Sequence, residues 1–345
     1  MLSRLLQLVP PETAHAVALR LLAWRRDRPP PTSERLARNL AGLQLANPIG
    51  LAAGLDKNAT ALRGLASLGF GFIEFGTVTP RPQPGNPRPR VFRLREDEAI
   101  INRLGFNNLG LDAAVRQLER LGPLPLPIGA NIGMNRDTPD PVLDYRLGVR
   151  RLHPLVDYLT VNLSSPNTPG LRALQHGDAL RRLLDGVFDE RARLDAPQRP
   201  LFVKLSPDIP EADLDDLVKI LESRRPDGLI IGNTTLARPQ GLRSRHRDEA
   251  GGLSGRPLAP IAARALSAIA TRVAGRIPLV AAGGIGDAAT VLDRLQRGAT
   301  AVQLYTALTY RGPGLVRRLA ADLEPLLAHD RPRSDAALDP AASPH

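Results

Sequence analysis

The stretch Thr160-Val161-Asn162-Leu163-Ser164-Ser165-Pro166-Asn167-Thr168-Pro169-Gly170 joins an apolar run to a short polar segment that contains two prolines. Residues 156–161 have the β-branched and apolar composition of a buried strand. The polar residues that follow offer hydroxyls and carboxamides, which can donate and accept hydrogen bonds on a flat polar ring. The same composition is typical of an ordinary turn. The rest of the chain favours the first interpretation, because a strand followed by polar residues recurs along it.

Eight apolar runs of this kind alternate with helical segments. The runs are 48–53, 71–77, 127–132, 156–163, 201–205, 228–231, 278–282 and 301–305. Helical periodicity is clear at 111–121, 212–224 and 259–274. Alternation of strands and helices favours a parallel sheet, and eight strands close a TIM barrel. We therefore predict an α/β fold with a (β/α)8 TIM barrel over residues 41–327 and a Pro- and Arg-rich excursion over the barrel mouth at 80–110.

Two shorter segments flank the predicted barrel. Residues 1–40 contain two apolar stripes, which predict a small N-terminal helical extension. The stripes are Leu2, Leu5, Leu6 and Val9, followed by Ala14, Val17, Ala18, Leu21 and Leu22. The pair is either a hairpin packed on the barrel or two amphipathic helices in a bilayer surface, with Trp24 at the headgroup level; prolines and charges exclude a membrane span. Residues 328–345 lack periodicity and are predicted to be a disordered tail.

Composition limits the chemistry. The chain of 345 residues contains no cysteine, so disulfides, thiolate metal sites and a cysteine base are excluded. Its net charge of +11 is compatible with nucleic acid, an anionic membrane or acidic small molecules. Only three of the 46 basic residues are lysine, namely Lys57, Lys204 and Lys219. The first two follow or end predicted strands, where a compact ammonium suits a binding site better than a planar guanidinium.

Polar or small residues follow every predicted strand, which indicates one ligand-binding mouth at the carboxyl ends of the strands. Gly283-Gly284 after the seventh strand and Tyr305-Thr306 after the eighth stand where this fold binds phosphate. Residues 251–255 form a second glycine-rich segment, either a phosphate-binding loop or a plain linker. No dinucleotide or Walker pattern is present, which favours a mononucleotide. No metal-ligand spacing and no serine-hydrolase elbow surround Ser165, so a bound cofactor is expected to carry the chemistry.

Four runs of sequence resemble the dihydroorotate dehydrogenase family. They are 52–58 (AAGLDKN), 85–94 with 102–107 (GNPRPRVFRL and NRLGFN), 162–172 (NLSSPNTPGLR) and 252–258 (GLSGRPL). Soluble members of the family use Cys as the catalytic base, whereas membrane-associated, quinone-reducing members use Ser. Ser165, the lack of Cys and the helical extension resemble the quinone-dependent class.

The resemblance implies FMN as cofactor, no metal, and oxidation of dihydroorotate to orotate in pyrimidine biosynthesis. Ser165 would be the base, with Thr168 and Phe106 beside the proton relay. The implied substrate-binding residues are Lys57, Asn102, Arg103, Leu104, Gly105, Phe106, Asn162, Asn167, Asn233 and Thr234. The implied FMN-binding residues are Ala53, Gly54, Leu55, Asp56, Lys57, Thr77, Asn131, Asn162, Lys204, Gly232, Gly255, Gly284, Tyr305 and Thr306. Gly232 and Met134 depart from residues common in the family, a hydroxyl residue and a lysine respectively.

The resemblance also implies a quinone as electron acceptor, reached between the two N-terminal helices, with His15 and Arg93 at the polar end of the tunnel. It further implies a monomer, without nucleic acid, on the cytoplasmic side of the cell inner membrane as a peripheral protein. Three alternatives stay open on the residues alone. A soluble dihydropyrimidine dehydrogenase or a tRNA dihydrouridine synthase would share an FMN barrel but normally depends on Cys. A non-enzymatic adaptor would leave the polar strand ends unexplained.

Overall fold

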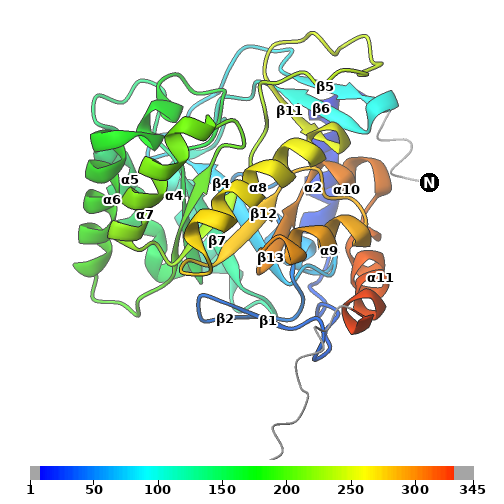
Figure 1. The fold of residues 1–345 in the computed structure, drawn as a ribbon, viewed down its shortest axis with the longest axis horizontal. Coiled ribbons are helices and arrows are strands. Elements are labelled where there is room, and N and C mark those ends of the chain that lie inside the picture. Colours follow the sequence, from blue (N-terminus) through cyan, green and yellow to red (C-terminus); the bar gives the residue numbers. More distant parts are fainter. Residues whose placement is uncertain (1–7, 330–345) are drawn as a thin grey trace, which may run out of the picture.

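The computed structural model describes residues 8–329. Eight parallel strands close into a barrel in the order β10-β12-β13-β3-β4-β7-β8-β9 (Figure 1). They are β3 (Ile49–Leu51), β4 (Phe72–Val78), β7 (Ile128–Ile132), β8 (Tyr158–Asn162), β9 (Leu201–Leu205), β10 (Gly228–Ile231), β12 (Leu279–Ala282) and β13 (Ala301–Leu304). Each strand begins and ends within two residues of the corresponding end of a predicted run. The predicted (β/α)8 barrel is confirmed.

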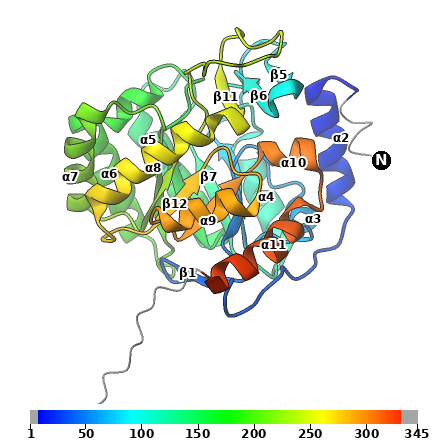
Figure 2. The same cartoon turned by 45° about the vertical axis from the view of Figure 1, so that its right-hand side comes forward.

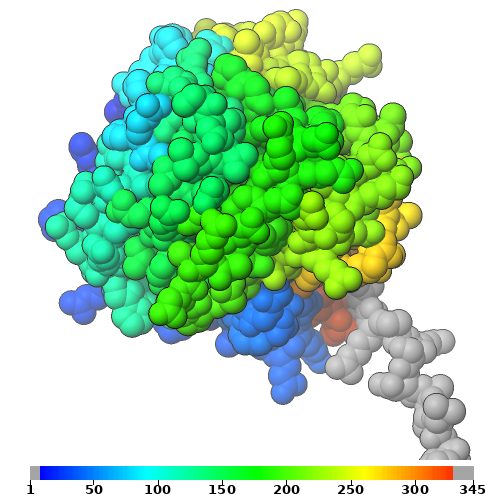
Figure 3. All heavy atoms as spheres, turned by 90° about the vertical axis from the view of Figure 1, so that its left-hand side faces the viewer, coloured from blue at the N-terminus to red at the C-terminus, as the bar shows by residue number. Residues whose placement is uncertain are grey.

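Helices surround the barrel. They are α3 (Leu62–Ala66), α4 (Gly110–Leu121), α5 (Pro141–Leu152), α6 (Gly177–Ala192), α7 (Leu214–Arg224), α8 (Ala259–Val273), α9 (Ala288–Gln296), α10 (Thr306–Arg311) and α11 (Leu315–His329). In the space-filling view of Figure 3 the green helices α5 to α7 form one continuous face. The segments predicted as helical at 111–121, 212–224 and 259–274 correspond to α4, α7 and α8.

Local sequence explains where these helices form and which side they bury. In α4 the buried residues Leu111, Ala114, Val115 and Leu118 recur at helical spacing, so one face packs on the barrel. The start of α5 is fixed by Asp140, whose carboxylate accepts hydrogen bonds from the backbone N–H groups of Val142 at 3.0 Å and Leu143 at 3.3 Å. Such a cap satisfies donors that the first turn leaves without a helical partner.

The barrel is filled by aromatic side chains near the amino ends of its strands. Tyr158 and Phe202 are fully buried there. A β-carbon at Gly129 would overlap the Tyr158 ring, so glycine on the neighbouring strand makes room for it. A hairpin of β1 (Arg38–Leu40) and β2 (Leu43–Leu45) packs Leu40 and Leu45 against the same cluster. The predicted boundary between residues 40 and 41 therefore falls inside a hairpin that closes the floor of the barrel.

The predicted excursion at 80–110 contains two strands, β5 (Val91–Leu94) and β6 (Ala99–Asn102). A third strand, β11 (Gly252–Gly255), pairs with β6 and completes an antiparallel sheet beside the mouth (Figure 2). The prediction of a loop or linker at 251–255 was wrong for this reason. Although the segment is rich in glycine, its backbone is held by pairing with β6, and Leu253 is buried against Phe92 and Ile101.

The second predicted N-terminal helix is α2 (Pro11–Ala23), which stands beside the barrel near α3 and β5 (Figure 2). The first stripe falls mostly on residues 2–6, outside the described residues. At the other end, α11 includes residues 328 and 329, which were predicted to belong to the tail; the remaining tail residues lie outside the described range. Between residues 8 and 329, no helix has both the length and the hydropathy needed to cross a bilayer.

Candidate active site

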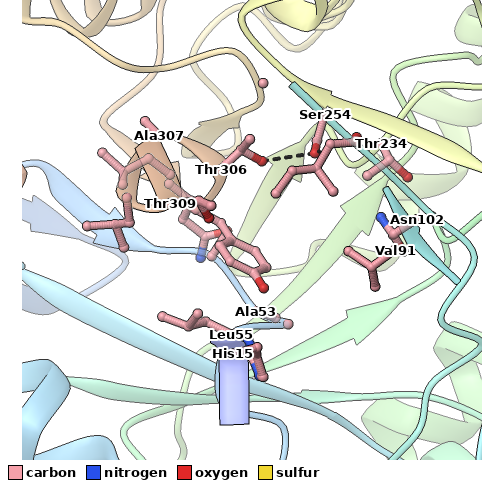
Figure 4. Close-up of a pocket in the computed structure, with 18 of the residues that line it drawn as sticks. His15, Ala53, Leu55, Val91, Asn102, Thr234, Ser254, Thr306, Ala307 and Thr309 are labelled. Atoms are coloured by element: carbon pink, nitrogen blue, oxygen red, sulfur yellow. Dashed lines mark hydrogen bonds between the residues drawn. The ribbon is translucent and has the colours of Figure 1, made fainter. Parts of the chain in front are cut away.

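The carboxyl ends of the barrel strands, the β5–β6–β11 sheet and α2 enclose a cavity of about 790 Å³. Figure 4 shows His15 and Leu55 on one side of it and Ser254 and Thr306 on another. Most of the residues singled out in the sequence line this one cavity. They are His15, Ala53, Gly54, Leu55, Lys57, Thr77, Arg93, Asn102, Leu104, Gly105, Phe106, Asn162, Ser165, Asn167, Lys204, Gly232, Asn233, Thr234, Gly255, Gly284, Tyr305 and Thr306.

Four predicted residues do not line the cavity. Asp56 is buried and accepts hydrogen bonds from the backbone N–H groups of Asn58 and Ala61, which makes it a cap of the local turn. Arg103 pairs with Glu249 at 2.9 Å. The other two, Asn131 and Thr168, are buried behind residues that do reach the cavity.

Ser165 lies in the loop after β8 and is 7% exposed. Its hydroxyl oxygen accepts a hydrogen bond from the backbone N–H of Asn167 at 3.3 Å. The loop is tied to its neighbours by Arg172, whose guanidinium donates to the carbonyls of Ser164 and Thr234, both at 3.1 Å. The same side chain pairs with Asp208 at 3.0 Å. One residue thus connects the loops that follow β8, β9 and β10.

Carboxamides form the floor of the mouth. The Asn162 side chain donates to the Asn131 oxygen at 2.9 Å and accepts from the Ser164 hydroxyl at 2.9 Å. Ser164 in turn accepts from the Asn233 amide at 2.8 Å. Because each group has a partner inside the protein, the amides are held in place.

Two lysines, Lys204 buried and Lys57 half-buried, give the mouth positive charge. Lys204 is 3.7 Å from the Glu74 carboxylate, and burial lowers its pKa although Glu74 opposes this effect. Lys57 has no carboxylate so close among residues 8–329. Burial, and next the nearby Arg90 charge, lower the pKa of Lys57 to about 8, while Glu12 and Asp56 raise it. An ammonium in this position is ready to bind an anion.

Glycine backbone lines the side of the cavity near β11 and β12. Gly255 and Gly284 have φ of +95° and +73°, and a β-carbon at either would overlap neighbouring backbone. Next to them Thr306 donates to the Ser254 hydroxyl at 2.9 Å (Figure 4). Backbone N–H groups that come this close to a cavity suit a phosphate. At Gly232 a β-carbon would overlap the Ala282 carbonyl, so the absence of a hydroxyl side chain here follows from the backbone.

Some buried polar atoms in this region have no partner within the described residues. They are the hydroxyl of Thr234, the hydroxyl of Thr168 and the side-chain oxygen of Asn107. Burying a polar group without a hydrogen bond is unfavourable, so such atoms indicate a ligand or water. Thr234 is one of the residues that line the cavity (Figure 4).

The other end of the cavity is lined by α2. Glu12 on this helix accepts hydrogen bonds from Arg90 at 2.9 and 3.0 Å and pairs with Arg88 at 3.2 Å. Arg93 donates to the carbonyl of Val9 at 2.9 Å. Burial, and next the Lys57 charge, lower the pKa of His15 to about 4, so its imidazole is neutral at physiological pH. The helix is therefore fixed to the excursion by charge, with a neutral His facing the cavity.

Sequence reasoning missed Glu74, Gln303, Ser254 and Arg172. Glu74 is fully buried in β4 and Gln303 is nearly so in β13. A charged or amide residue within an otherwise apolar run was the available signal for both, because burying such a group requires partners. Arg172 ends the motif at 162–172 but had no assigned role.

The closed parallel barrel, the positive charges and the glycine backbone define an α/β-barrel protein whose mouth suits an anionic nucleotide or acid. Comparison with known proteins makes the class specific. The sequence matches the family model for dihydroorotate dehydrogenase over residues 35–327, and the chain belongs to the dihydroorotate dehydrogenase family. The resemblance seen in the sequence is thus confirmed, and members of this family are flavin-dependent.

The similar proteins named here are all dihydroorotate dehydrogenases. The dihydroorotate dehydrogenase (quinone) of Sphingopyxis alaskensis is 50% identical over 322 residues, which cover 92% of this chain and 90% of the relative. The mitochondrial dihydroorotate dehydrogenase (quinone) of Mus musculus is 46% identical over 93% of this chain and 84% of its own. The crystal structure of the Eimeria tenella enzyme in complex with ferulenol is 40% identical, with a TM-score of 0.89 and coverage of 93% and 92%.

Proposed function

We propose that this protein oxidises dihydroorotate to orotate in pyrimidine biosynthesis, with FMN as its flavin and a quinone as the final electron acceptor. The observation that carries the proposal is the single cavity that contains Ser165 and the carboxamides at one end and α2 with His15 at the other. Substrate and acceptor can then reach one flavin from different directions. The quinone-type names of the similar proteins support the acceptor.

The residues present fit a flavin mononucleotide. Gly255, Gly284 and Thr306 offer backbone N–H groups and a hydroxyl to a phosphate. Lys204 offers a buried ammonium to an electron-rich ring edge, where a fixed cation is worth more than in water. When bound, FMN supplies the hydride acceptor and the electron transfer to quinone, which no side chain of this protein can supply.

At the substrate end, Ser165 is the base that we assign to the proton at C5 of dihydroorotate. A free Ser hydroxyl is a weak base at neutral pH, so its own proton must leave as it accepts another. Thr168, whose buried hydroxyl has no partner in the part of the chain that the structure describes, and Phe106 border the relay that we assign to this proton. Lys57 binds the substrate carboxylate, while Asn102, Asn162, Asn167, Asn233 and Thr234 hydrogen-bond the ring.

At the acceptor end, α2 is the element that we assign to quinone access and membrane contact. Its cavity side carries His15 and small apolar residues, and Trp24 at its end is 89% exposed. Aromatic residues with arginines nearby are typical of a helix lying in a membrane interface. We propose a peripheral monomer on the cytoplasmic side of the cell inner membrane.

A dihydropyrimidine or tRNA dihydrouridine enzyme would share the barrel, but neither the family nor the similar proteins support these alternatives. The proposal is tested by anaerobic stopped-flow absorbance on FMN-loaded protein. Dihydroorotate is expected to bleach the flavin, and a long-tailed quinone is expected to restore its colour. A flavin that stays oxidised with dihydroorotate refutes the substrate, and one that is reoxidised no faster by quinone than by buffer refutes the acceptor.

A further inference from the structure

Glu74 is a fully buried carboxylate in the barrel interior, below the cavity, and the chemistry described above does not use it. It accepts hydrogen bonds from four side chains. The donors are Asn131 at 2.8 Å on one carboxylate oxygen, and Thr160 at 2.9 Å, Gln303 at 2.9 Å and Tyr158 at 3.4 Å on the other. Burying a carboxylate is unfavourable unless its oxygens are satisfied, and here both are.

The chemistry of Lys204 independently fixes the direction of these bonds. An ammonium can only donate, so the Gln303 oxygen faces Lys204, at 3.4 Å. The NH2 group of Gln303 must then face Glu74, which requires the Glu74 oxygen to accept. A carboxylate with an ammonium 3.7 Å from its other oxygen meets that requirement.

The Glu74 oxygen that accepts from Asn131 determines the direction of the bonds between Glu74 and the cavity in the same way. Because Glu74 only accepts, Asn131 must turn its NH2 group down and its oxygen up, where Thr77 at 2.5 Å and Asn162 at 2.9 Å donate to it. Asn162 must then present its own oxygen to Ser164, whose hydroxyl donates at 2.9 Å and whose backbone N–H donates at 3.2 Å.

The last step reaches the cavity wall. Because the Ser164 hydroxyl donates its proton to Asn162, it can only accept from the NH2 group of Asn233, at 2.8 Å. The Asn233 oxygen is used by the backbone N–H of Thr234 at 2.8 Å. Asn233 therefore presents its remaining N–H, and not its oxygen, to a ligand. An amide of the same shape turned by 180° would present the opposite group.

We propose that Glu74 is a positioning residue that sets the donor and acceptor directions of the mouth, through Asn131, Asn162 and Ser164 to Asn233. The inference rests on the proposed function, because it concerns the groups that would bind the orotate ring. The chain of bonds is held at both ends. Glu74 fixes the lower end, and the backbone N–H of Ser164, which cannot turn around, fixes the upper end.

A glutamine at position 74 has the same shape but must donate on one side. If its NH2 group faces Asn131, it meets the NH2 group of Asn131, and two donors face each other. If Asn131 and Asn162 turn over to avoid this, the NH2 group of Asn162 meets the backbone N–H of Ser164, and two donors face each other there instead. If the NH2 group at position 74 faces Gln303 instead, two donors meet there, because Lys204 holds the Gln303 oxygen. Every arrangement leaves one mismatched pair, and a buried donor without an acceptor is unfavourable.

The first experiment measures orotate binding to oxidised, FMN-loaded protein by calorimetry, without turnover. A mismatched pair present with and without ligand lowers folding stability, and it lowers orotate affinity where the amides above it turn over and orotate has to restore their directions. E74Q is expected to adopt this turned arrangement of Asn131 and Asn162 and to bind orotate about tenfold or more weakly than the unmodified protein. The matched control is E190Q, since Glu190 is also buried and pairs with Arg146 at 3.0 Å, far from the mouth on α6. E190Q is expected to lower the melting temperature and keep the orotate affinity. Equal orotate affinity in E74Q and the unmodified protein overturns the proposal.

The second experiment restores the donor and acceptor directions of the mouth by moving the carboxylate from position 74 to its hydrogen-bond partner at position 131. In E74Q/N131D, the new amide at position 74 donates to the new carboxylate at position 131, whose other oxygen accepts from Thr77 and Asn162 as Asn131 does now. Orotate affinity is expected to recover to within about threefold, whereas N131D alone places two carboxylates together and stays weak. A folded double variant that binds orotate tenfold more weakly than the unmodified protein contradicts the proposal, and it carries the test if E74Q does not fold.

These outcomes are separable from a failure of the proposed function. Unmodified protein that neither binds orotate nor is reduced by dihydroorotate would refute the function itself. Unmodified protein that binds orotate and variants that bind it equally well would refute only the role of Glu74. Retention of FMN, measured by flavin fluorescence released on dilution, shows in each variant that the cofactor site is intact.

Discussion

Replacing Arg172 with alanine is expected to disturb catalysis more than its distance from the reacting atoms suggests. The side chain is 23% exposed and makes three charged hydrogen bonds, to the Ser164 carbonyl, the Thr234 carbonyl and Asp208. Such bonds contribute about 1.5–3 kcal/mol each when fully protected. Water replaces part of this at a partly exposed site, so we expect a loss smaller than the sum of the three lowest values, about 3 kcal/mol in total. That corresponds to a fall in Tm of about 4 °C, because the unfolding entropy of a chain of this length is about 0.7 kcal/mol/K.

The same change releases the backbone on which Ser165 is mounted. A displacement of about 1 Å in a catalytic group lowers a rate by roughly a hundredfold, and this is the loss expected in the rate of flavin reduction by dihydroorotate. The measurement is single-turnover stopped flow at saturating substrate, so that binding does not contribute. The matched control is Arg146→Ala, which removes one of two arginines from Glu190 and should lower only Tm. An R172A protein that is reduced at the rate of the R146A protein would refute the reasoning.

The cavity supports three further predictions. Ser165→Ala is expected to slow flavin reduction by at least a thousandfold while FMN stays bound, since no other hydroxyl in the described residues lies at its position. Flavin absorbance measures both the rate of reduction and the amount of bound FMN. Unchanged reduction kinetics would reject Ser165 as the base. The KM for dihydroorotate is expected to stay constant below pH 8 and to rise about tenfold per pH unit above it. The reason is that Lys57, with its pKa lowered to about 8, loses its charge in this range. A KM that stays constant up to pH 10 would contradict the role of Lys57. Deleting residues 1–25 is expected to reduce quinone reoxidation and vesicle binding at least tenfold, with flavin reduction at pH 7 retained, and equal rates with a long-tailed quinone would exclude α2 as the access route.

The barrel and most of the mouth could be predicted because both depend on patterns local to the chain. Apolar runs of strand length gave the eight strands, and the polar residue after each run belonged to the mouth because parallel strands end at the same edge. Composition was misleading where pairing decides the structure. Residues 251–255 look like a flexible loop, yet their backbone pairs with β6.

The contacts that hold the mouth together could not be predicted in the same way. The partners of Glu74 come from β7, β8 and β13, which are up to 229 positions away in the sequence. Which of its neighbours point into the barrel depends on the strand register, and no local pattern gives this. At Asp56 the sequence predicted a site residue that the structure does not place in the cavity. A carboxylate directly after a strand is typical of a binding residue, but Asp56 caps its own turn.

The two lysines of the mouth illustrate why the N-terminal helix matters to the substrate as well as to the quinone. Lys204 has its counter-charge inside the barrel, at Glu74. Lys57 depends instead on Asp56 and on Glu12, and Glu12 belongs to α2, where it also binds Arg90. Removing this carboxylate takes away a contribution that raises the pKa of Lys57 and leaves the opposing Arg90 charge in place. In Glu12→Gln the pH at which KM begins to rise should therefore move below 8, and an unchanged midpoint would show that α2 and the substrate end are electrostatically independent.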